Sequence, residues 1–442
     1  MKRFILCLLA VVLTFALSGP AEVLASDPLT NHLTNWPYME DLSVDSAVLI
    51  DADNGAILYS LNRDTKRFPA SITKVMTCLL VLENTRMDEV VTMTETGMAE
   101  AYGGSSNVDP VLGEQFTVEQ CLYMLMLKSA NDIASQLAEY VGGSVAGFAD
   151  MMNQRAAALG CTGTHFHNAN GLPDEEHFTT AYDMALIMRE ALKNEEFRKI
   201  AGTISYSVAP TNKKQETRIY ENHFRLIVPS HERYYENAIC GKTGYTNAAL
   251  RTLIGAAQKD GRTLVAVTMH GPSKDDFLDM TNLFEYGFNR FKTLDVSAAD
   301  GSSEGTVTIP NDFSLEQLSP VETESRIDYY YEELFVGGAD RKALPTPSVT
   351  ETPAEESPEA SLPAVSEVSE VSELSAGQEL SGRTEEMEEK KAGSGKLLPV
   401  LLVLAAILAG IIAYKRYLDA EREKKRKRRR KRNSEKREDS KR

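Results

Sequence analysis

The chain has 442 residues, enough for two domains plus extensions, and its net charge is −16. From Lys415 onward it carries 16 Lys/Arg against 6 Asp/Glu, so everything before that point is strongly acidic. The cysteines show no CxxC or Cys/His spacing that indicates a metal site.

The N-terminus has the pattern of a secretory signal. Lys2 and Arg3 precede an apolar run over residues 4–17, and Val23-Leu24-Ala25 fits a small-residue cleavage site. We therefore predict a signal peptide over residues 1–25, with an uncleaved anchor as the alternative.

The body begins with a hairpin and continues with helices. Residues 46–62 hold two apolar strands around Asp53-Asn54-Gly55, a strong turn signal. Apolar periodicity predicts helices over 72–82, 117–140 and 181–192, the second interrupted at 128–132.

Strands return after this helical middle. Residues 251–257 and 262–270 alternate around Lys259-Asp260-Gly261, and a helix is predicted over 277–291. Strands, then helices, then strands indicate an α+β fold with one antiparallel sheet, and we assign residues 34–292 to one catalytic domain.

Beyond that domain we expect a small β-rich module over residues 293–343, with strands at 305–309 and 327–335. Residues 344–395 are rich in Pro, Ser, Glu and Val and repeat Val-Ser-Glu, which predicts a disordered acidic stalk.

An uncharged apolar run over 397–414 is long enough to cross a bilayer, and we predict a transmembrane helix at 396–415. A buried core helix is the alternative. The basic tail, 416–442, places the C-terminus in the cytoplasm and the catalytic body outside, tethered to a single-pass anchor. Beside a membrane, attraction to anionic lipid explains this tail better than nucleic-acid binding does.

Four cysteines remain after the predicted cleavage: Cys78, Cys121, Cys161 and Cys240. Disulfides are possible in an exported protein. Cys78 and Cys121 nevertheless sit in apolar helical segments and are typical of small core residues.

Ser71-Ile72-Thr73-Lys74 opens the first long helix. Positions i and i+3 share one helix face, so the Lys74 amine can reach the Ser71 hydroxyl. A serine becomes a good nucleophile when a neighbouring base takes its proton. The spacing therefore predicts Ser71 as nucleophile and Lys74 as general base, although Ser-x-x-Lys alone occurs often by chance.

Two further motifs strengthen this prediction. Ser129-Ala130-Asn131 follows an apolar helix, and Lys242-Thr243-Gly244 precedes a predicted strand. A helix cap and an ordinary strand entry are the plain explanations of each alone. The order Ser-x-x-Lys, Ser-x-Asn, Lys-Thr-Gly is the motif set of penicillin-binding proteins and serine β-lactamases.

The flanking residues narrow the resemblance. The chain resembles the D-alanyl-D-alanine carboxypeptidases, the low-molecular-weight penicillin-binding proteins of peptidase family S11, over roughly residues 37–292. The resemblance rests on residues 69–74, 128–132 and 241–246, supported by 166–172 and 177–181. It implies the penicillin-binding/β-lactamase-like serine transpeptidase fold, with an antiparallel sheet, helices on both sides and a helical subdomain.

The resemblance also implies the site. Ser71 attacks the penultimate D-alanine carbonyl of peptidoglycan stem peptides, and Ser129 relays a proton between Lys74 and the leaving amine. The backbone N–H groups of Ser71 and Tyr245 form the oxyanion hole. The substrate is held by Asn131, Lys242, Thr243 and Gly244. β-Lactams are expected as covalent inhibitors, with no cofactor and no metal.

One position departs from the family. Related carboxypeptidases commonly carry an arginine near the start of the helix after the last strand, where it binds the terminal carboxylate. Asp276 occupies that region, and the open alternatives are that Lys274 substitutes for the arginine or that carboxylate recognition rests on Lys242 and Thr243. A β-lactamase of related fold and a catalytically silent wall-binding scaffold are the alternative functions. The sequence contains no G-x-S-x-G, H-E-x-x-H or Walker A motif.

Overall fold

The computed structural model describes residues 28–40, 42–100, 105–272 and 276–342, all within the compact unit Met1–Thr350. The predicted signal peptide, stalk, membrane helix and basic tail lie outside these residues, and so does Lys274. Within the described ranges, no helix is both long and apolar enough to cross a bilayer.

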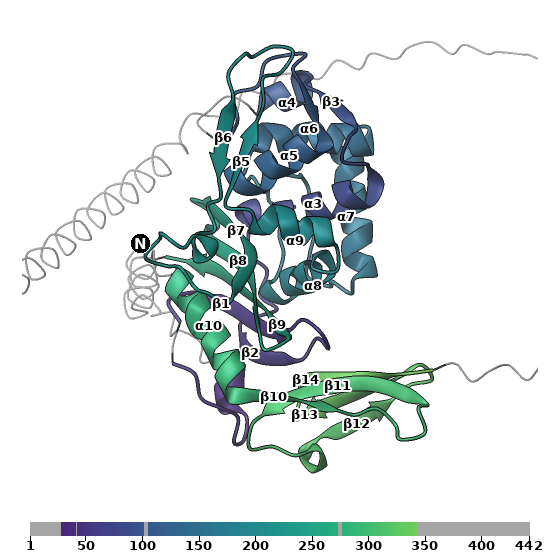
Figure 1. Cartoon of the computed structure of the whole chain (residues 1–442). Helices are drawn as coiled ribbons and strands as arrows, with labels where there is room; N and C mark the ends of the chain where they lie inside the picture. Colours follow the sequence, from purple (N-terminus) through teal and green to yellow (C-terminus); the bar gives the residue numbers. More distant parts are fainter. Residues whose placement is uncertain (1–27, 41, 101–104, 273–275, 343–442) are drawn as a thin grey trace, which may run out of the picture. The chain divides into compact units, whose positions relative to one another are not determined.

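An antiparallel five-stranded sheet organises the first domain (Figure 1). Both predicted hairpins are confirmed. Strand β7 (Ala238–Thr246) forms one edge of the sheet, and its outer side pairs with no described strand. Lys242-Thr243-Gly244 lies inside this edge strand rather than before it, which corrects the sequence expectation. The strand order is β2 (Ile57–Leu61), β1 (Ser46–Asp51), β9 (Arg262–Gly271), β8 (Leu250–Lys259) and β7 (Ala238–Thr246).

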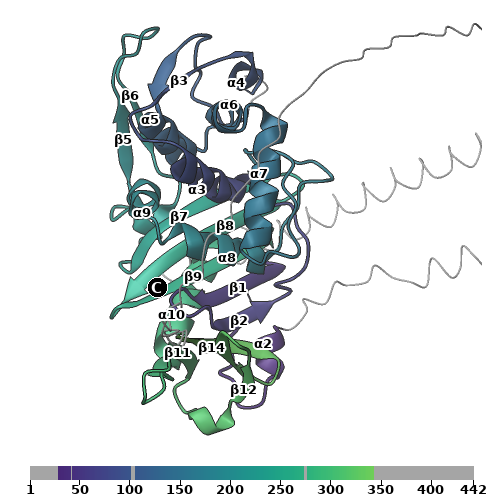
Figure 2. The ribbon, with the colours of Figure 1, turned by 90° about the vertical axis from the view of Figure 1, so that its right-hand side faces the viewer.

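Helices cover both faces of this sheet, as the fold class predicts (Figure 2). Helix α10 (Asp276–Arg290) lies on one face, where Gly287 packs closely on Leu264. Helix α8 (Ala181–Ala191) lies on the other, begun by a Thr180 side chain that accepts from the Asp183 N–H. Both faces of β1 are therefore buried.

A helical subdomain packs beyond α8 and is centred on α3 (Lys74–Asn84), whose apolar residues from Val75 to Val81 are buried. The predicted interruption near 128–132 is confirmed, because a π-helical turn over Met124–Lys128 separates two α-helices. The remaining helices are α2 (Leu29–His32), α4 (Glu95–Ala99), α5 (Val118–Tyr123), α6 (Asn131–Gly142), α7 (Val145–Ala158) and α9 (Glu195–Gly202), with short 3₁₀ turns at Ala70–Thr73, Arg225–Ile227 and Leu315–Gln317.

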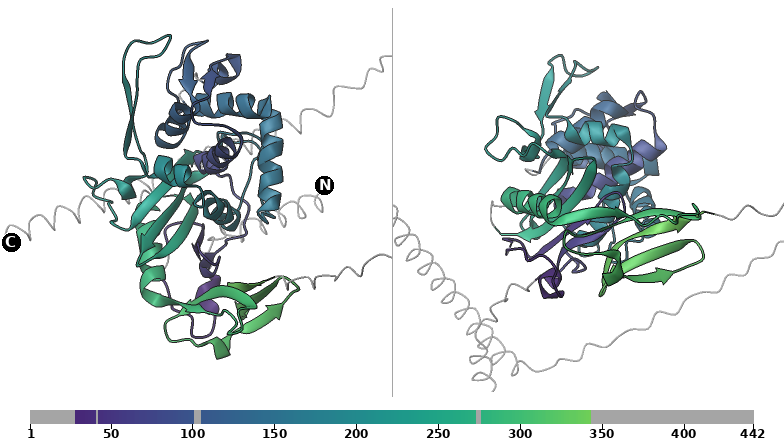
Figure 3. Two further views of the ribbon diagram at one scale, coloured as in Figure 1. Left: turned by 45° about the vertical axis from the view of Figure 1, so that its right-hand side comes forward. Right: turned by 60° about the horizontal axis from the view of Figure 1, so that its bottom comes forward.

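Two small antiparallel pairs, which the sequence did not predict, border the helical subdomain. They are β3 (Val90–Thr92) with β4 (Gln115–Thr117), and β5 (Ser205–Val208) with β6 (Arg218–Glu221). The β5–β6 pair extends away from the main sheet (Figure 3, left).

The C-terminal sheet follows α10 directly (Figure 3, right). Trp36 stacks on Tyr331 of this sheet with centroids 5.7 Å apart, and Asn54 donates to Thr308 at 2.9 Å, so the sheet is joined to the first hairpin. The expected single strand over 327–335 is wrong, because the chain turns at Glu332 between two strands. The order is β10 (Phe291–Asp295), β11 (Ser303–Pro310), β14 (Leu334–Arg341), β13 (Arg326–Tyr331) and β12 (Ser319–Glu322).

All four cysteines of the described body carry free thiols. Cys78, Cys121 and Cys240 are buried, and burial raises the pKa of the Cys240 thiol to about 12. Cys78 and Cys121 belong to the hydrophobic core, as their apolar surroundings in the sequence predict.

Candidate functional site

Ser71 lies in the short 3₁₀ turn Ala70–Thr73, immediately before α3. Ala70 has a φ of +51°, a left-handed conformation that is uncommon for a residue with a side chain. Such strained backbone persists when surrounding contacts hold it, and it is often found at functional sites. The turn leaves Ser71 one helical turn ahead of Lys74.

The Lys74 amine lies at the centre of the candidate site. Its Nζ is 3.0 Å from Ser71 Oγ, 2.7 Å from Asn131 Oδ1 and 2.5 Å from the Asn170 carbonyl oxygen. The two amide oxygens can only accept hydrogen bonds. When the amine is neutral, these two oxygens accept hydrogen bonds from its two N–H groups. The nitrogen lone pair can then accept the hydrogen bond of the Ser71 hydroxyl. The arrangement is that of a base poised beside its nucleophile.

Electrostatics favour this neutral amine. Complete burial holds the pKa of Lys74 well below its ordinary value, and the charge of Lys242 lowers it further. Asp132 and Glu100 oppose this shift. Lys242 is itself buried, which lowers its pKa to about 7.

The loop over residues 169–171 positions this amine. No chemical role was predicted for this loop from the sequence. The Asn170 carbonyl accepts from Lys74, and Thr77 on α3 donates to the neighbouring Ala169 carbonyl at 2.7 Å. Gly171 follows with a φ of +88°, and a Cβ there would lie 1.9 Å from the Ala70 oxygen. Only glycine lets this loop approach the Ser71 turn so closely.

Replacing Gly171 by alanine is therefore expected to displace the Ser71 turn and slow acylation by about 10²-fold, the effect of a misplacement near 1 Å. The rate of labelling by fluorescent penicillin measures this. Gly160→Ala is the matched control, because Gly160 also has a positive φ of +81° but has open space around it. Equal rates for the two variants would contradict the steric argument.

A buried histidine fixes the same turn from the other side. His177 Nε2 lies 2.9 Å from Thr73 Oγ1, and its Nδ1 accepts from the His167 N–H at 3.0 Å. The proton is therefore on Nε2, which donates to Thr73. Burial lowers the pKa of His177 to about 3, so the ring stays neutral and has a structural role here.

Ser129 and Asn131 flank the start of α6, and the structure brings only Asn131 into contact with Lys74. Ser129 has a left-handed φ of +63°, and its buried Oγ has no hydrogen-bond partner among the described residues. The hydroxyl therefore makes no hydrogen bond to Lys74 in this structure, and the relay through Ser129 to a leaving amine stays a prediction.

The edge strand β7 brings the third motif to the nucleophile. Gly244 faces Ser71, since a Cβ at Gly244 would lie 2.9 Å from the Ser71 nitrogen. Thr252, its partner on β8, donates to the Pro69 carbonyl at 2.8 Å and joins the sheet to the turn. Tyr245 is 60% exposed at the open end of β7. Lys242 donates to the Thr243 carbonyl at 2.8 Å.

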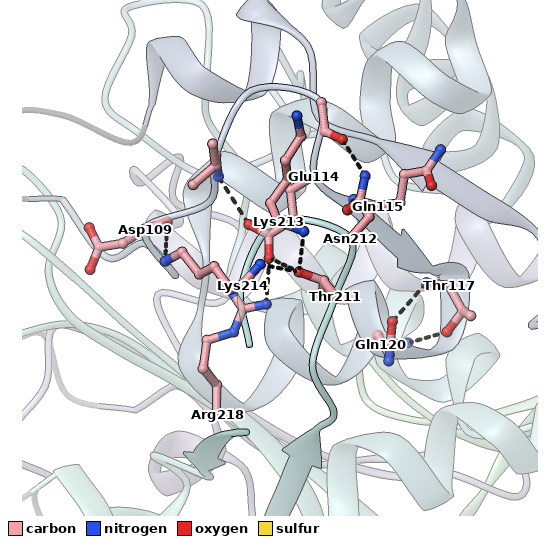
Figure 4. A network of polar contacts seen from close by, with 12 residues as sticks. Asp109, Glu114, Gln115, Thr117, Gln120, Thr211, Asn212, Lys213, Lys214 and Arg218 are labelled. Atoms are coloured by element: carbon pink, nitrogen blue, oxygen red, sulfur yellow. Dashed lines mark hydrogen bonds and ion pairs between the residues drawn. The ribbon is translucent and has the colours of Figure 1, made fainter. Parts of the chain in front are cut away.

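A pocket of about 850 Å³ adjoins the Ser129 segment, with Lys128, Ser106 and His223 in its lining. Its wall is fixed by a polar network between two loops (Figure 4). Buried Glu114 accepts from Arg218 and from Thr211, both at 2.6 Å. The pocket borders the second motif only through Lys128, and neither Ser71 nor Lys74 lines it.

Asp276, the departure from the family pattern, is buried at the start of α10 and accepts from Arg251 Nε at 2.9 Å. Arg251 lies on β8 opposite Tyr245, and the sequence analysis did not identify it. No local motif marks it, because only strand pairing brings it beside Tyr245.

One group of possible metal ligands, His167, Asp174 and Glu176, is found among the described residues. His167 and Glu176 are exposed and Asp174 is half-buried. The nitrogen–oxygen distances to His167 are 3.8 Å for Asp174 and 3.7 Å for Glu176. These are ordinary long ion-pair distances, and the group takes no part in the chemistry of Ser71.

Comparisons with known proteins agree on one family. A family model described as D-alanyl-D-alanine carboxypeptidase (Peptidase S11) matches residues 33–273. D-alanyl-D-alanine carboxypeptidase DacF of Bacillus subtilis is 33% identical over 302 residues, covering 66% of this chain and 72% of the relative. DacB2 of Mycobacterium tuberculosis is 34% identical over 249 residues, covering 54% of this chain and 81% of the relative.

Solved structures show the same fold. Penicillin-binding protein 6B of Escherichia coli superimposes with a TM-score of 0.58 at 26% identity, covering 70% of this chain and 98% of that one. The Streptomyces K15 DD-transpeptidase superimposes with a TM-score of 0.54 at 29% identity, covering 57% and 99%. The penicillin-binding-protein-like α+β fold is thereby confirmed.

Proposed function

The chain belongs to peptidase family S11, the D-alanyl-D-alanine carboxypeptidases, and on that premise we propose that it removes the terminal D-alanine of peptidoglycan stem peptides through an acyl-enzyme on Ser71. It is a serine-type hydrolase and a penicillin-binding protein. The observation that carries the catalytic assignment is the Lys74 amine, 3.0 Å from Ser71 Oγ with two carbonyl oxygens on its other side.

Acylation begins when Lys74 takes the proton of Ser71 Oγ and the oxygen attacks the carbonyl carbon of the penultimate D-alanine. The negative charge that develops on the carbonyl oxygen is stabilised by the N–H groups of Ser71 and Tyr245. The C–N bond to the terminal D-alanine then breaks. Its nitrogen receives the proton from Lys74 through Ser129, whose hydroxyl has no competing hydrogen-bond partner among the described residues.

Deacylation returns the enzyme to its starting state. Lys74 takes a proton from water, the resulting hydroxide attacks the ester carbon, and Ser71 Oγ leaves with the proton. A β-lactam follows the first step only. Its leaving nitrogen stays tethered to the acyl group, so the adduct persists.

Substrate binding uses the open edge of β7. An extended peptide adds to a free strand edge by main-chain hydrogen bonds. Asn131 offers its amide to the peptide backbone, and Lys242, Thr243 and Gly244 border the end where the terminal carboxylate lies. The site is proposed to work outside the cytoplasmic membrane, on a single-pass C-terminal anchor beside anionic lipid. The signal and anchor patterns of the sequence support this location.

The decisive experiment incubates the full-length protein, in detergent, with a pentapeptide ending in D-Ala-D-Ala and with a chromogenic cephalosporin. We expect released D-alanine and a stoichiometric, slowly hydrolysed cephalosporin adduct that peptide mapping locates on Ser71. Rapid steady cephalosporin hydrolysis would instead identify a β-lactamase. Absence of both reactions would identify a silent scaffold.

A further inference from the structure

The exchange of the family's helix-start arginine for Asp276 raises the question of what binds the substrate carboxylate. An acidic residue there repels a carboxylate unless a cation covers it. Asp276 is covered: it is buried, and its Oδ2 accepts from Arg251 Nε at 2.9 Å. Among the described residues, the positive charge beside Asp276 therefore comes from Arg251 on strand β8.

Strand register places Arg251 beside the Lys-Thr-Gly segment. Thr243 pairs with Leu253, and Tyr245 pairs with Arg251. Side chains alternate along a strand, so Thr243 and Arg251 share a face as diagonal cross-strand neighbours, which lie about 7–8 Å apart with their Cβ atoms somewhat closer. This separation suits a ligand that bridges a hydroxyl and a guanidinium.

The same alternation separates this face from the nucleophile's face. Gly244 and Thr252 point toward the Ser71 turn. Gly255 lies on the same face of β8 as Arg251, because an even number of residues separates the two positions. It approaches Met280 of α10. Arg251 therefore lies on the α10 side of the sheet, the side to which Thr243 also projects.

The contact with Asp276 orients the guanidinium and leaves its two Nη groups available to a ligand. Only Nε is bonded, and among the described residues neither Nη1 nor Nη2 has a hydrogen-bond partner. Asp276 Oδ1 is also without a partner there, so the ion pair is single-bonded. The side chain of Arg251 is 29% exposed. Its free Nη1–Nη2 fork has the planar geometry that matches a carboxylate.

We propose that Arg251, oriented by Asp276, binds the C-terminal carboxylate of the D-Ala-D-Ala substrate together with Thr243. Arg251 is then a substrate-binding residue, and Asp276 is a positioning residue that acts through it. This inference rests on the proposed function, because it assigns the terminal carboxylate of that substrate.

Carboxylate preference tests it directly. Ser71→Ala in the full chain keeps the substrate-binding residues but cannot react. Equilibrium binding of acetyl-D-Ala-D-Ala and of its C-terminal amide to this variant can therefore be compared by calorimetry. We expect the free acid to bind more tightly, and adding Arg251→Gln to reduce this preference by about 10- to 100-fold, the worth of a hydrogen bond to a charged group. An unchanged preference overturns the proposal.

Two further variants separate recognition from folding. Arg251→Gln leaves Asp276 buried and unpaired, so Arg251→Gln/Asp276→Asn removes both charges and should fold while still lacking the preference. Arg251→Ala/Asp276→Arg moves the guanidinium to the helix start, as in related carboxypeptidases, and should restore it. Arg290→Gln, at an exposed arginine in the last turn of α10, is the matched control and should change nothing. Lost preference in the control, or no recovery in the swapped variant, contradicts the assignment.

The binding readout does not depend on turnover. Failure of the proposed function appears as an absence of D-alanine release and of Ser71 labelling in the wild-type protein. Failure of the Arg251 assignment appears as intact preference for the free acid in Ser71→Ala/Arg251→Gln.

Discussion

Replacing Lys74 by methionine should slow acylation of Ser71 by penicillin by about 10³-fold or more, within the range that general-base catalysis contributes. Methionine matches the length of the buried side chain and introduces no charge. It cannot take the Ser71 proton, so the hydroxyl remains a weak nucleophile. The rate of covalent labelling by fluorescent penicillin, fitted over a series of concentrations, gives the second-order constant.

The variant must remain folded for this result to count. Methionine leaves Asn131 Oδ1 and the Asn170 carbonyl without their donor, at a cost of about 1–3 kcal/mol each. Thermal unfolding monitored by circular dichroism therefore accompanies the kinetics. Lys193→Met, at an exposed lysine after α8, is the matched control and should label at the wild-type rate.

Ser71 and Lys74 are expected to act as one unit. Ser71→Ala should abolish labelling, and Ser71→Ala/Lys74→Met should release D-alanine no more slowly than either single variant, because groups that share one step are not additive. A Lys74→Met protein that labels at close to the wild-type rate would assign the base to another residue.

Local sequence was sufficient for this pair and for the elements around it. Ser71 and Lys74 are only three residues apart, in the 3₁₀ turn and at the first residue of α3, so their proximity could be read from local sequence. The hairpin around Gly55 was likewise predictable, since the turn has the residues that a positive φ requires. Motif order then indicated which other segments converge on Ser71.

Features that depend on contacts between distant segments, or on rare backbone conformations, could not be predicted from local sequence. Asn170 acts through its backbone carbonyl, which carries no residue signal. The turn between β13 and β14 has Glu332 at a φ of +50°, a conformation that glutamate seldom adopts, so the two strands were predicted as one.

Strand β7 was misplaced for a related reason. Gly241 and Gly244 lower its strand propensity, yet both are required by close contacts: a Cβ at Gly241 would lie 2.4 Å from Phe224, and one at Gly244 would lie 2.9 Å from the Ser71 nitrogen. The residues that weakened the sequence signal are the ones that let the sheet reach the nucleophile.

Lys242→Gln should lower kcat/KM for the pentapeptide by about 10- to 100-fold near neutral pH, through the loss of a charged group in the site. It should also change the pH dependence. The Lys242 charge lowers the pKa of Lys74, so removing that charge raises the pKa of Lys74. A smaller fraction of the base is then neutral at a given pH, and the rising limb of acylation moves to higher pH.

The pKa of Lys242 sets where this difference is largest. Because that pKa is about 7, Lys242 is charged and assists Lys74 below pH 7, and its assistance fades as the pH rises above 7. The wild-type advantage over Lys242→Gln should therefore be greater at pH 6 than at pH 9, measured as second-order penicillin acylation rates. Lys242→Arg keeps a cation throughout and should retain the acid-side limb. Parallel profiles for wild type and Lys242→Gln would show that Lys242 binds substrate without tuning the base.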